Sequence, residues 1–296
     1  MGLSLRARLW RYLIQRAFRN KPKTLAEVRA QSQSNARMMI LPRDVTVEDA
    51  PIDEMHGLWI RPNSGEAHQV ILYLHGGGYV TGDSHSYRTL CAPLARLLKI
   101  PILIPDYRLA PEHPFPAGLE DAQKTYRWLL AQGFAAHNIV LCGDSAGGGL
   151  SMATVIALRN AGLPLPAAVV CLSPWADLTL SGQSHTTQAD AEVMLSTDML
   201  REWAAYYTHA ANWTHPLVSP IFADLTDFPP LLIQVGSREI LLDDARRLAE
   251  NARAAGVDVT LSVYDGLWHV WPILGDLIPE SKAAFEEIGA FLNKKT

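Results

Sequence analysis

Residues 138–160 read NIVLCGDSAGGGLSMATVIALRN. An apolar run leads directly into Gly143-Asp144-Ser145-Ala146-Gly147, and a helix-forming stretch follows; this is the strand, G-x-S-x-G and helix context of a nucleophile elbow. The glycines suit such a turn because it brings backbone and helix too close for a Cβ atom. The pattern predicts that Ser145 stands at the apex of the turn with its hydroxyl above the sheet. Asp144 beside it is expected to have a supporting role.

A second glycine motif precedes the elbow. His75-Gly76-Gly77-Gly78 follows the apolar run 70–74. With a nucleophile elbow, the oxyanion hole combines the N–H group of the residue after the serine with a loop of this HGGG type. We therefore expect the backbone N–H groups of Gly77, Gly78 and Ala146 to be the oxyanion donors. His75 is expected to hold the loop in shape rather than to react, because such donors must be fixed in place.

Around these motifs the chain alternates apolar strand-like runs with helical patterns. The expected strands are 70–74, 101–105, 138–142, 167–172, 231–235 and 258–264, and the expected helices are about 86–98, 118–132, 147–160, 240–254 and 281–293. Continuous apolar runs are typical of parallel strands covered on both faces. Alternating βα units predict an α/β fold with an open, mostly parallel sheet and helices on both faces. Residues 44–61 are expected to add one or two strands at the sheet edge.

The alternation predicts a catalytic domain over residues 46–296 and an N-terminal helical cap segment over residues 1–45. An insertion at about 175–218 interrupts the alternation and is expected to complete the cap. This insertion is rich in aromatic residues, namely Trp175, Trp203, Tyr206, Tyr207 and Trp213. Such side chains either pack the cap onto the core or line an apolar substrate pocket.

The N-terminal 26 residues contain seven basic residues and no acid. Apolar residues recur at helical spacing: Leu5, Leu9, Tyr12, Leu13 and Ala17. The stretch is not a signal peptide, because charges interrupt every apolar core. It is not a membrane-spanning helix either, because no run of apolar residues in it is long enough to cross a bilayer. One interpretation is an amphipathic cap helix that uses this stripe to lie over the mouth of the active site. The other is a helix whose basic face also touches an anionic membrane. We expect a cytoplasmic protein.

Composition narrows the class of protein. The 296 residues are 48% hydrophobic and 19% charged, as in soluble globular chains, and the net charge of −4 gives no reason to expect a nucleic-acid partner. The three cysteines, Cys91, Cys142 and Cys171, are odd in number and lack a C-x-x-C motif. They are expected to be buried free thiols rather than disulfides or metal ligands. Neither a metal nor an organic cofactor is expected.

A serine nucleophile needs a base, and the base needs an acid to hold its tautomer. In folds with a nucleophile elbow, the acid and then the histidine follow the serine along the chain. Of the histidines after Ser145, only His269 lies in a loop after a late strand. The others, His185, His209 and His215, fall in the cap region and are expected to be packing or surface residues.

Three carboxylates compete for the role of the acid. Glu239 comes soonest after the strand 231–235, in the loop where an acid can reach an imidazole at the carboxyl end of the sheet. Asp243 and Asp244 fall in the first turn of the next helix, where acids also serve to complement the helix dipole. We favour Glu239 and keep Asp243 and Asp244 as alternatives.

Three motifs together carry a family resemblance. These are His75-Gly76-Gly77-Gly78-Tyr79, the segment DYRLAPEHPFPA at residues 106–117, and Gly143-Asp144-Ser145-Ala146-Gly147-Gly148. From about residue 50 to its C-terminus, the chain resembles the hormone-sensitive-lipase-like esterases, the bacterial family IV carboxylesterases. The resemblance implies an α/β-hydrolase fold with a helical cap. It also implies a triad of Ser145, Glu239 and His269, with the oxyanion role on Gly77 and Gly78.

The sequence departs from the family at the acid, which is usually an aspartate followed by proline, whereas Glu239 is followed by Ile240. The expected activity is hydrolysis of short- to medium-chain esters through an acyl-enzyme. The alternatives are a lactone, acetyl-ester or amide hydrolase with the same triad. A non-catalytic small-ligand receptor resembling the plant gibberellin receptors is disfavoured because His269 is retained. The expected binding partner is a small-molecule ester. The sequence also leaves open a homodimer and a peripheral membrane contact through the basic N-terminal helix.

Overall fold

The computed structural model describes residues 2–19, 24–37, 41–64 and 68–295. In this part of the chain, strands form one sheet in the order β1-β2-β4-β3-β5-β6-β7-β8. The strands are β1 (Val45–Asp49), β2 (Gly57–Pro62), β3 (Val70–Leu74), β4 (Ile102–Pro105), β5 (Ile139–Asp144), β6 (Ala168–Leu172), β7 (Leu231–Gly236) and β8 (Val259–Tyr264). The six apolar runs are thus confirmed as strands, and the segment 44–61 contributes the two edge strands β1 and β2.

The pairing shows how the sheet is connected. From β4 to β8 all neighbouring strands are parallel, whereas β1 pairs with β2 and β2 with β4 in antiparallel fashion. The chain starts its parallel part near the middle with β3, moves out to β4, and then crosses back to β5 and on to β8. Because the parallel strands end at the same edge, the loops that follow β3, β5, β6, β7 and β8 gather there.

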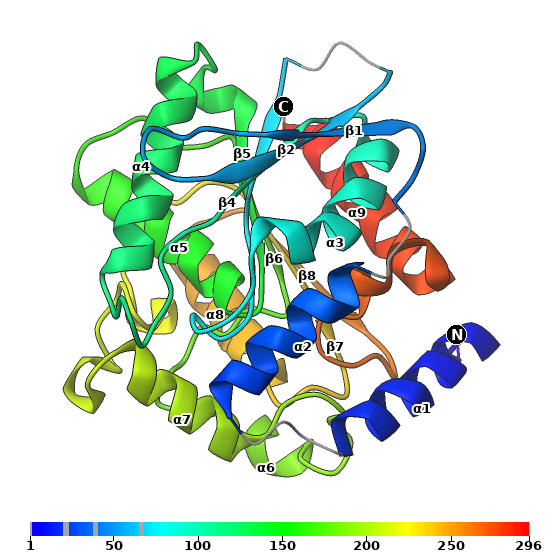
Figure 1. The fold of residues 1–296 in the computed structure, drawn as a ribbon. Helices are drawn as coiled ribbons and strands as arrows, with labels where there is room; N and C mark the ends of the chain where they lie inside the picture. Colours follow the sequence, from blue (N-terminus) through cyan, green and yellow to red (C-terminus); the bar gives the residue numbers. More distant parts are fainter. Residues whose placement is uncertain (1, 20–23, 38–40, 65–67, 296) are drawn as a thin grey trace.

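Helices cover both faces of the sheet (Figure 1). They are α1 (Leu5–Arg19), α2 (Leu25–Arg37), α3 (Ser84–Leu98), α4 (Ala117–Ala131), α5 (Ala146–Asn160), α6 (Ser184–Thr187), α7 (Thr197–Tyr207), α8 (Leu242–Ala254) and α9 (Pro279–Lys295). Alternate residues of β3 show why its whole run is apolar. Val70, Leu72 and Leu74 join the core under α4, α5 and α8, while Ile71 and Tyr73 join the core under α3 and α9.

Short 3₁₀ turns complete the described segments: Ala136–Asn138, Ala210–Asn212, Pro220–Phe222 and Trp271–Leu277.

The connection between β6 and β7 contains α6 and α7. Together with α2, these helices lie along the lower side of the molecule in Figure 1.

The N-terminal helix α1 packs on the core through a face other than its apolar stripe. Ala7 is fully buried, and Trp10 and Ile14 pack on the cluster around Trp268 and Trp271. The stripe itself faces outward: Leu5, Leu9, Tyr12, Leu13 and Ala17 are exposed. The helix therefore has two apolar faces. The face that packs on the core is not the one that the periodicity of the sequence indicated. No helix in the described ranges has the length and apolar character needed to cross a bilayer.

Candidate active site

Ser145 lies in a sharp turn between β5 and α5. Its backbone has φ 52° and ψ −124°, a conformation that a residue with a side chain rarely adopts. Its N–H group donates to the carbonyl of Leu172 at 2.8 Å, and its carbonyl accepts from the N–H group of Trp175 at 2.9 Å. The end of β6 thus holds the turn in its unusual conformation, as expected for a strained functional residue.

The flanking glycines are required by contact with backbone. A Cβ atom on Gly143 would lie 2.3 Å from the carbonyl oxygen of Gly147. A Cβ atom on Gly147 would lie 2.0 Å from the carbonyl oxygen of Leu74 and 2.5 Å from that of His75. These neighbours are main-chain atoms that cannot move aside cheaply. The glycines therefore allow α5 to start directly against the end of β3.

An unbroken chain of hydrogen bonds begins at the Ser145 hydroxyl. His269 Nε2 lies 3.0 Å from Ser145 Oγ, and His269 Nδ1 lies 2.9 Å from Glu239 Oε2. The other oxygen of Glu239 accepts from Ser173 Oγ at 2.7 Å and from the Gly236 N–H group at 2.5 Å. The three residues come from the loops after β5, β7 and β8, which the sheet brings together. Each of them is buried.

The surroundings of His269 raise its pKa above the ordinary value of 6.5. Burial by itself would lower this pKa, because it disfavours the charged imidazolium. The hydrogen bond to Glu239 and the negative charges of Glu239 and Glu192 act in the opposite direction and outweigh it. The site therefore stabilises an imidazolium next to the serine hydroxyl.

The glycine loop lies against the elbow. Gly77 and Gly78 have φ values of 103° and 63°, which glycine adopts readily. The Gly77 carbonyl accepts from the N–H groups of Val80 and Thr81, which closes the loop. In the described part of the chain, the N–H groups of Gly77 and Gly78 have no hydrogen-bond acceptor. They remain available to a bound group.

His75 is packed as a structural residue. Its ring stacks on Tyr107 with centroids 4.2 Å apart, and its Nδ1 lies 2.8 Å from the carbonyl of Gly76. The Tyr107 hydroxyl donates to the His75 carbonyl at 2.6 Å. Burial lowers the pKa of His75, which favours the neutral ring. These contacts hold the ring and the backbone of His75 in place at the start of the glycine loop.

Asp144 joins the elbow to the glycine loop. Its carboxylate accepts from the Gly76 N–H group at 3.0 Å and from the hydroxyls of Tyr73 and Tyr87 at 2.9 and 3.1 Å. Burial raises the pKa of Asp144 to about 6, although the hydrogen bonds oppose the shift. The Asp144 carboxylate thus holds the first glycine of the loop against the elbow.

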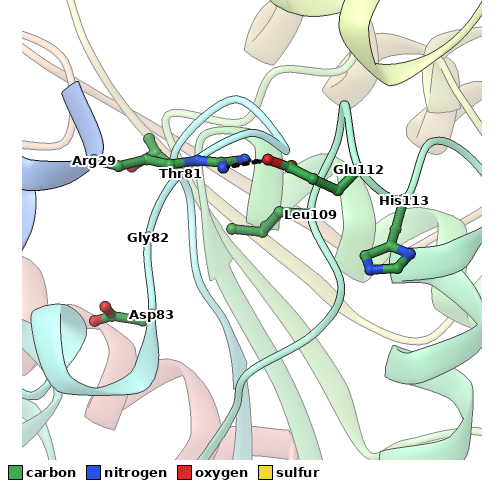
Figure 2. A pocket seen from close by; sticks show the side chains of 7 residues that line it. All are labelled: Arg29, Thr81, Gly82, Asp83, Leu109, Glu112 and His113. Carbon is green, nitrogen blue, oxygen red and sulfur yellow. Dashed lines mark hydrogen bonds and ion pairs between the residues drawn. The ribbon is translucent and has the colours of Figure 1, made fainter. Parts of the chain in front are cut away.

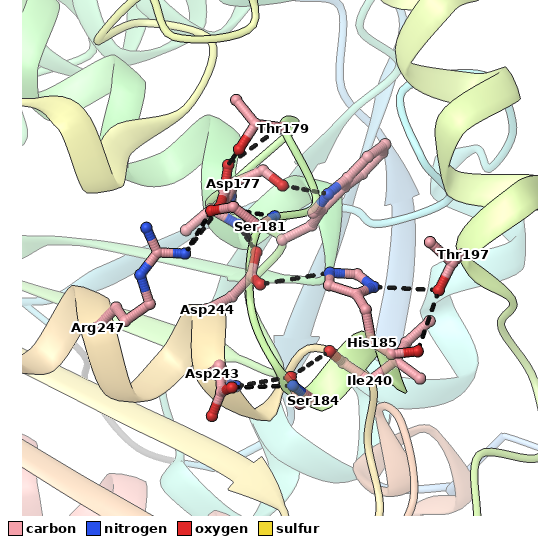
Figure 3. A network of polar contacts seen from close by, with 12 residues as sticks. Asp177, Thr179, Ser181, Ser184, His185, Thr197, Ile240, Asp243, Asp244 and Arg247 are labelled. Carbon is pink, nitrogen blue, oxygen red and sulfur yellow. Dashed lines mark hydrogen bonds and ion pairs between the residues drawn. The ribbon is translucent and has the colours of Figure 1, made fainter. Parts of the chain in front are cut away.

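The two rival acids are occupied elsewhere (Figure 3). Asp243 accepts from the Ser184 N–H group at 2.9 Å, and its own N–H group donates to Ser184 Oγ. Asp244 is fully buried and accepts from the N–H groups of Ala176 and Asp177, each at 2.9 Å. Both lie in the first turn of α8. They fasten α6 and the segment after β6 to that helix, and in the part of the chain that the structure describes neither is hydrogen-bonded to His269.

The other histidines of this region also have structural contacts. His209 and His215 each accept an N–H group two residues further on, from Ala211 and Leu217. His185 is buried, with Nε2 3.9 Å from Asp244 Oδ1 and Nδ1 3.4 Å from the Thr197 hydroxyl. None of the three lies in the hydrogen-bonded chain of Ser145.

Glu192 is a buried acid beside the site. The sequence motifs did not identify it. One oxygen accepts from the N–H groups of Val193 and Met194, each at 2.9 Å. The other accepts from the N–H group of Ile240 at 3.3 Å, next to Glu239 in the chain. Burial and the nearby charge of Glu239 raise the pKa of Glu192. The only signal was an acid followed by three apolar residues, Val193, Met194 and Leu195.

Helix α7 covers the glycine loop. A Cβ atom on Gly78 would lie 2.0 Å from Cε3 of Trp203, so this indole sits directly against the loop. Tyr207, one turn further along α7, stacks on Tyr79 with ring centroids 3.8 Å apart. Aromatic residues of α7 therefore pack this helix onto the core, and Trp203 also borders the space next to Gly78.

Helix α2 is fastened to the same region by Arg29 (Figure 2). The guanidinium donates to the carbonyls of Val80 and Ala110 at 2.7 and 2.9 Å and forms two bonds to the Glu112 carboxylate. A cavity of about 360 Å³ lies beside this link, lined by Arg29, Thr81, Gly82, Asp83, Leu109, Glu112 and His113. Neither Ser145, Glu239 nor His269 is among its lining residues.

Comparisons with known proteins identify the family to which this chain belongs. A family model of the α/β hydrolase fold matches residues 71–273. An acetyl-hydrolase of Streptomyces hygroscopicus is 44% identical over 276 residues, covering 93% of this chain and 90% of the relative. An esterase of Acinetobacter venetianus is 34% identical, covering 85% and 84%. A crystal structure of an esterase from the bacterial hormone-sensitive lipase family superposes with a TM-score of 0.95 at 43% identity, covering 100% and 99%.

The chain therefore belongs to the α/β-hydrolase family, within its hormone-sensitive-lipase-like branch. It is a carboxylesterase, an enzyme that hydrolyses carboxylic esters.

Proposed function

We propose that this carboxylesterase acts through a triad in which Ser145 is the nucleophile, His269 the general base and Glu239 the acid. The observation that carries the proposal is the continuous hydrogen-bonded chain from Ser145 Oγ through both ring nitrogens of His269 to a carboxylate that is itself held by Ser173. Such a chain is the arrangement that activates a serine hydroxyl.

The proposed reaction has two halves. Ser145 Oγ attacks the ester carbonyl carbon while His269 Nε2 takes the hydroxyl proton, and Glu239 stabilises the imidazolium. The tetrahedral oxyanion accepts hydrogen bonds from Gly77, Gly78 and Ala146. When the intermediate collapses, the bond to the alcohol oxygen breaks and His269 returns the proton to the alkoxide. Water then attacks the acyl-enzyme by the same route and releases the carboxylic acid.

The N-terminus of α5 supports the role of Ala146. Ala146 is the first residue of this helix, so its N–H group is one of those that the helix itself leaves without a partner. Gly77 and Gly78 are the matching donors on the glycine loop. Removal of one oxyanion donor typically lowers the rate by about 10²–10³-fold.

We further propose short- to medium-chain esters as substrates. Trp203 stands directly against Gly78 and limits the room beside the proposed oxyanion donors. The name of the Streptomyces relative, an acetyl-hydrolase, favours the short end of this range. Lactones, acetyl esters and amides remain the alternative substrates, because the same steps cleave all of them. We also propose a cytoplasmic location, which the buried free thiols of Cys91, Cys142 and Cys171 favour.

The replacement Ser145→Ala tests the nucleophile. It should abolish turnover of p-nitrophenyl butyrate and labelling by a fluorophosphonate probe, because both need the hydroxyl oxygen. The control Ser151→Ala removes a hydroxyl that donates to the Gly147 carbonyl one turn back in α5, and it should keep both activities. Turnover retained by the Ser145 variant would contradict the proposal.

A further inference from the structure

Helix α1 is anchored through one face only. Its inner residues Ala7, Trp10 and Ile14 pack on the cluster around Trp268. Arg11 donates to the carbonyl of Ala191 at 2.9 Å, which ties the helix to the segment before α7. The start of the helix is held by Glu280, which accepts from the N–H and hydroxyl groups of Ser4. These contacts fix which side of α1 faces away from the protein.

The outer face carries a stripe of large apolar side chains, here called the α1 stripe: Leu5, Leu9, Tyr12 and Leu13. They are 82%, 56%, 58% and 41% exposed. Their spacing of three and four residues places them in one row along the helix. Figure 1 shows α1 at the edge of the molecule beside α9. Four exposed large apolar residues in one row differ from the scattered ones that a soluble surface normally carries.

The charged side chains of α1 itself are of one sign. Arg6, Arg8 and Arg16 are exposed on the same helix, and α1 contains no acidic residue. At the start of the helix, a hollow of about 430 Å³ is lined by Leu5, Arg6 and Lys282 among others. The acid that shares this hollow, Asp276, is paired with Arg96 at 2.7 Å. An apolar row bordered by arginines matches a surface that is apolar inside and negatively charged outside.

From this juxtaposition we propose that the α1 stripe docks the enzyme onto an anionic lipid surface. The helix lies in the plane of the interface, with the four apolar side chains among the acyl chains and the arginines at the level of the phosphates. Attraction between the arginines and anionic headgroups adds to the burial of the stripe. The anchored inner face keeps the helix folded before it docks, so that binding requires little ordering.

Co-sedimentation with lipid vesicles tests this proposal. The wild-type protein should bind vesicles of phosphatidylglycerol and phosphatidylcholine, should bind pure phosphatidylcholine vesicles far less, and should be released by added salt. The double variant Leu9→Glu/Leu13→Glu should lower the vesicle partition coefficient by about tenfold or more, because two buried apolar side chains are lost. The variant Arg6→Glu/Arg16→Glu should remove the preference for anionic lipid.

A matched control is available on the same molecule. Phe222 and Val263 are each 41% exposed and lie on other elements. The variant Phe222→Glu/Val263→Glu adds the same charge and removes similar apolar surface, so it should bind vesicles as the wild type does. All variants should hydrolyse p-nitrophenyl acetate in solution at the wild-type rate, which shows that they are folded.

Two results would overturn the proposal. One is a wild-type protein that does not bind anionic vesicles, or a stripe variant that binds them as tightly as the control. The other is a wild-type protein that is a dimer by light scattering and does not bind lipid, together with a Leu9→Glu/Leu13→Glu variant that is a monomer. In that case a second copy of this chain covers the stripe.

Discussion

Glu239 is the residue on which the proposed triad departs most from the family pattern. One oxygen of Glu239 is hydrogen-bonded to His269, and the other accepts from Ser173 and Gly236. Both oxygens of this side chain, which is one methylene longer than an aspartate, therefore have partners. We predict that Glu239→Gln lowers kcat for p-nitrophenyl butyrate by ~10²–10⁴-fold, because a neutral amide neither stabilises the imidazolium nor selects its tautomer. Steady-state kinetics would measure this loss.

The matched control for this change is Asp243→Asn. Asp243 bonds to Ser184 and lies outside the hydrogen-bonded chain, so its amide should keep most of the activity. If Asp243→Asn were the more damaging of the two changes, the acid would be assigned to the wrong residue.

The raised pKa of His269 predicts the acid side of the pH profile. The base acts as neutral imidazole, so kcat/KM should fall as the pH drops through a pKa above 6.5. Replacing Glu192 by glutamine removes one of the negative charges that raise this pKa. The acid limb of the Glu192→Gln profile should therefore move to lower pH, a shift that a purely structural role would not produce. An unmoved limb would contradict a charge effect of Glu192.

Helix α7 positions Trp203 against the glycine loop, so the size of one side chain on this element should set the acyl preference. We predict that Trp203→Ala moves the optimum of a p-nitrophenyl ester series, from acetyl to decanoyl, toward longer chains. The ratio of kcat/KM for octanoate to that for acetate is the measurement. Trp213→Ala is a control on the same insertion, since its indole bonds to the Thr208 carbonyl. An unchanged ratio in the Trp203 variant would mean that another element limits the acyl chain.

The whole molecule depends on links between parts that are distant in sequence. Arg29 joins α2 to the segments after β3 and β4 through the carbonyls of Val80 and Ala110. We predict that Arg29→Ala lowers kcat/KM several-fold, since α2 loses its hydrogen bonds to the segment that follows the glycine loop, while a fluorophosphonate still labels the serine. Arg61→Ala breaks an exposed pair with Glu48 and should change neither readout. Equal kinetics for the two variants would show that α2 needs no such link.

Local patterns were sufficient for much of the fold. Continuous apolar runs identified the parallel strands because both faces of each strand are buried, so that alternate residues of β3 serve two different cores. The glycines at 143 and 147 identified the elbow because backbone atoms occupy the space of their missing side chains. Chain order pointed to Ser145, Glu239 and His269, and these are the residues that the structure connects by hydrogen bonds.

Other features depend on which segments meet in space. Only the folded structure shows that Asp243 and Asp244 bond to Ser184, Ala176 and Asp177, which the sequence does not indicate. Glu192 became part of the site because its loop folds back onto Ile240, 48 positions away. The periodicity of a sequence identifies an apolar row on a helix, but it does not show whether that row faces the core or the solvent. Helix α1 has two such rows, and the packing of Trp10 and Ile14 on the core left the other row facing outward.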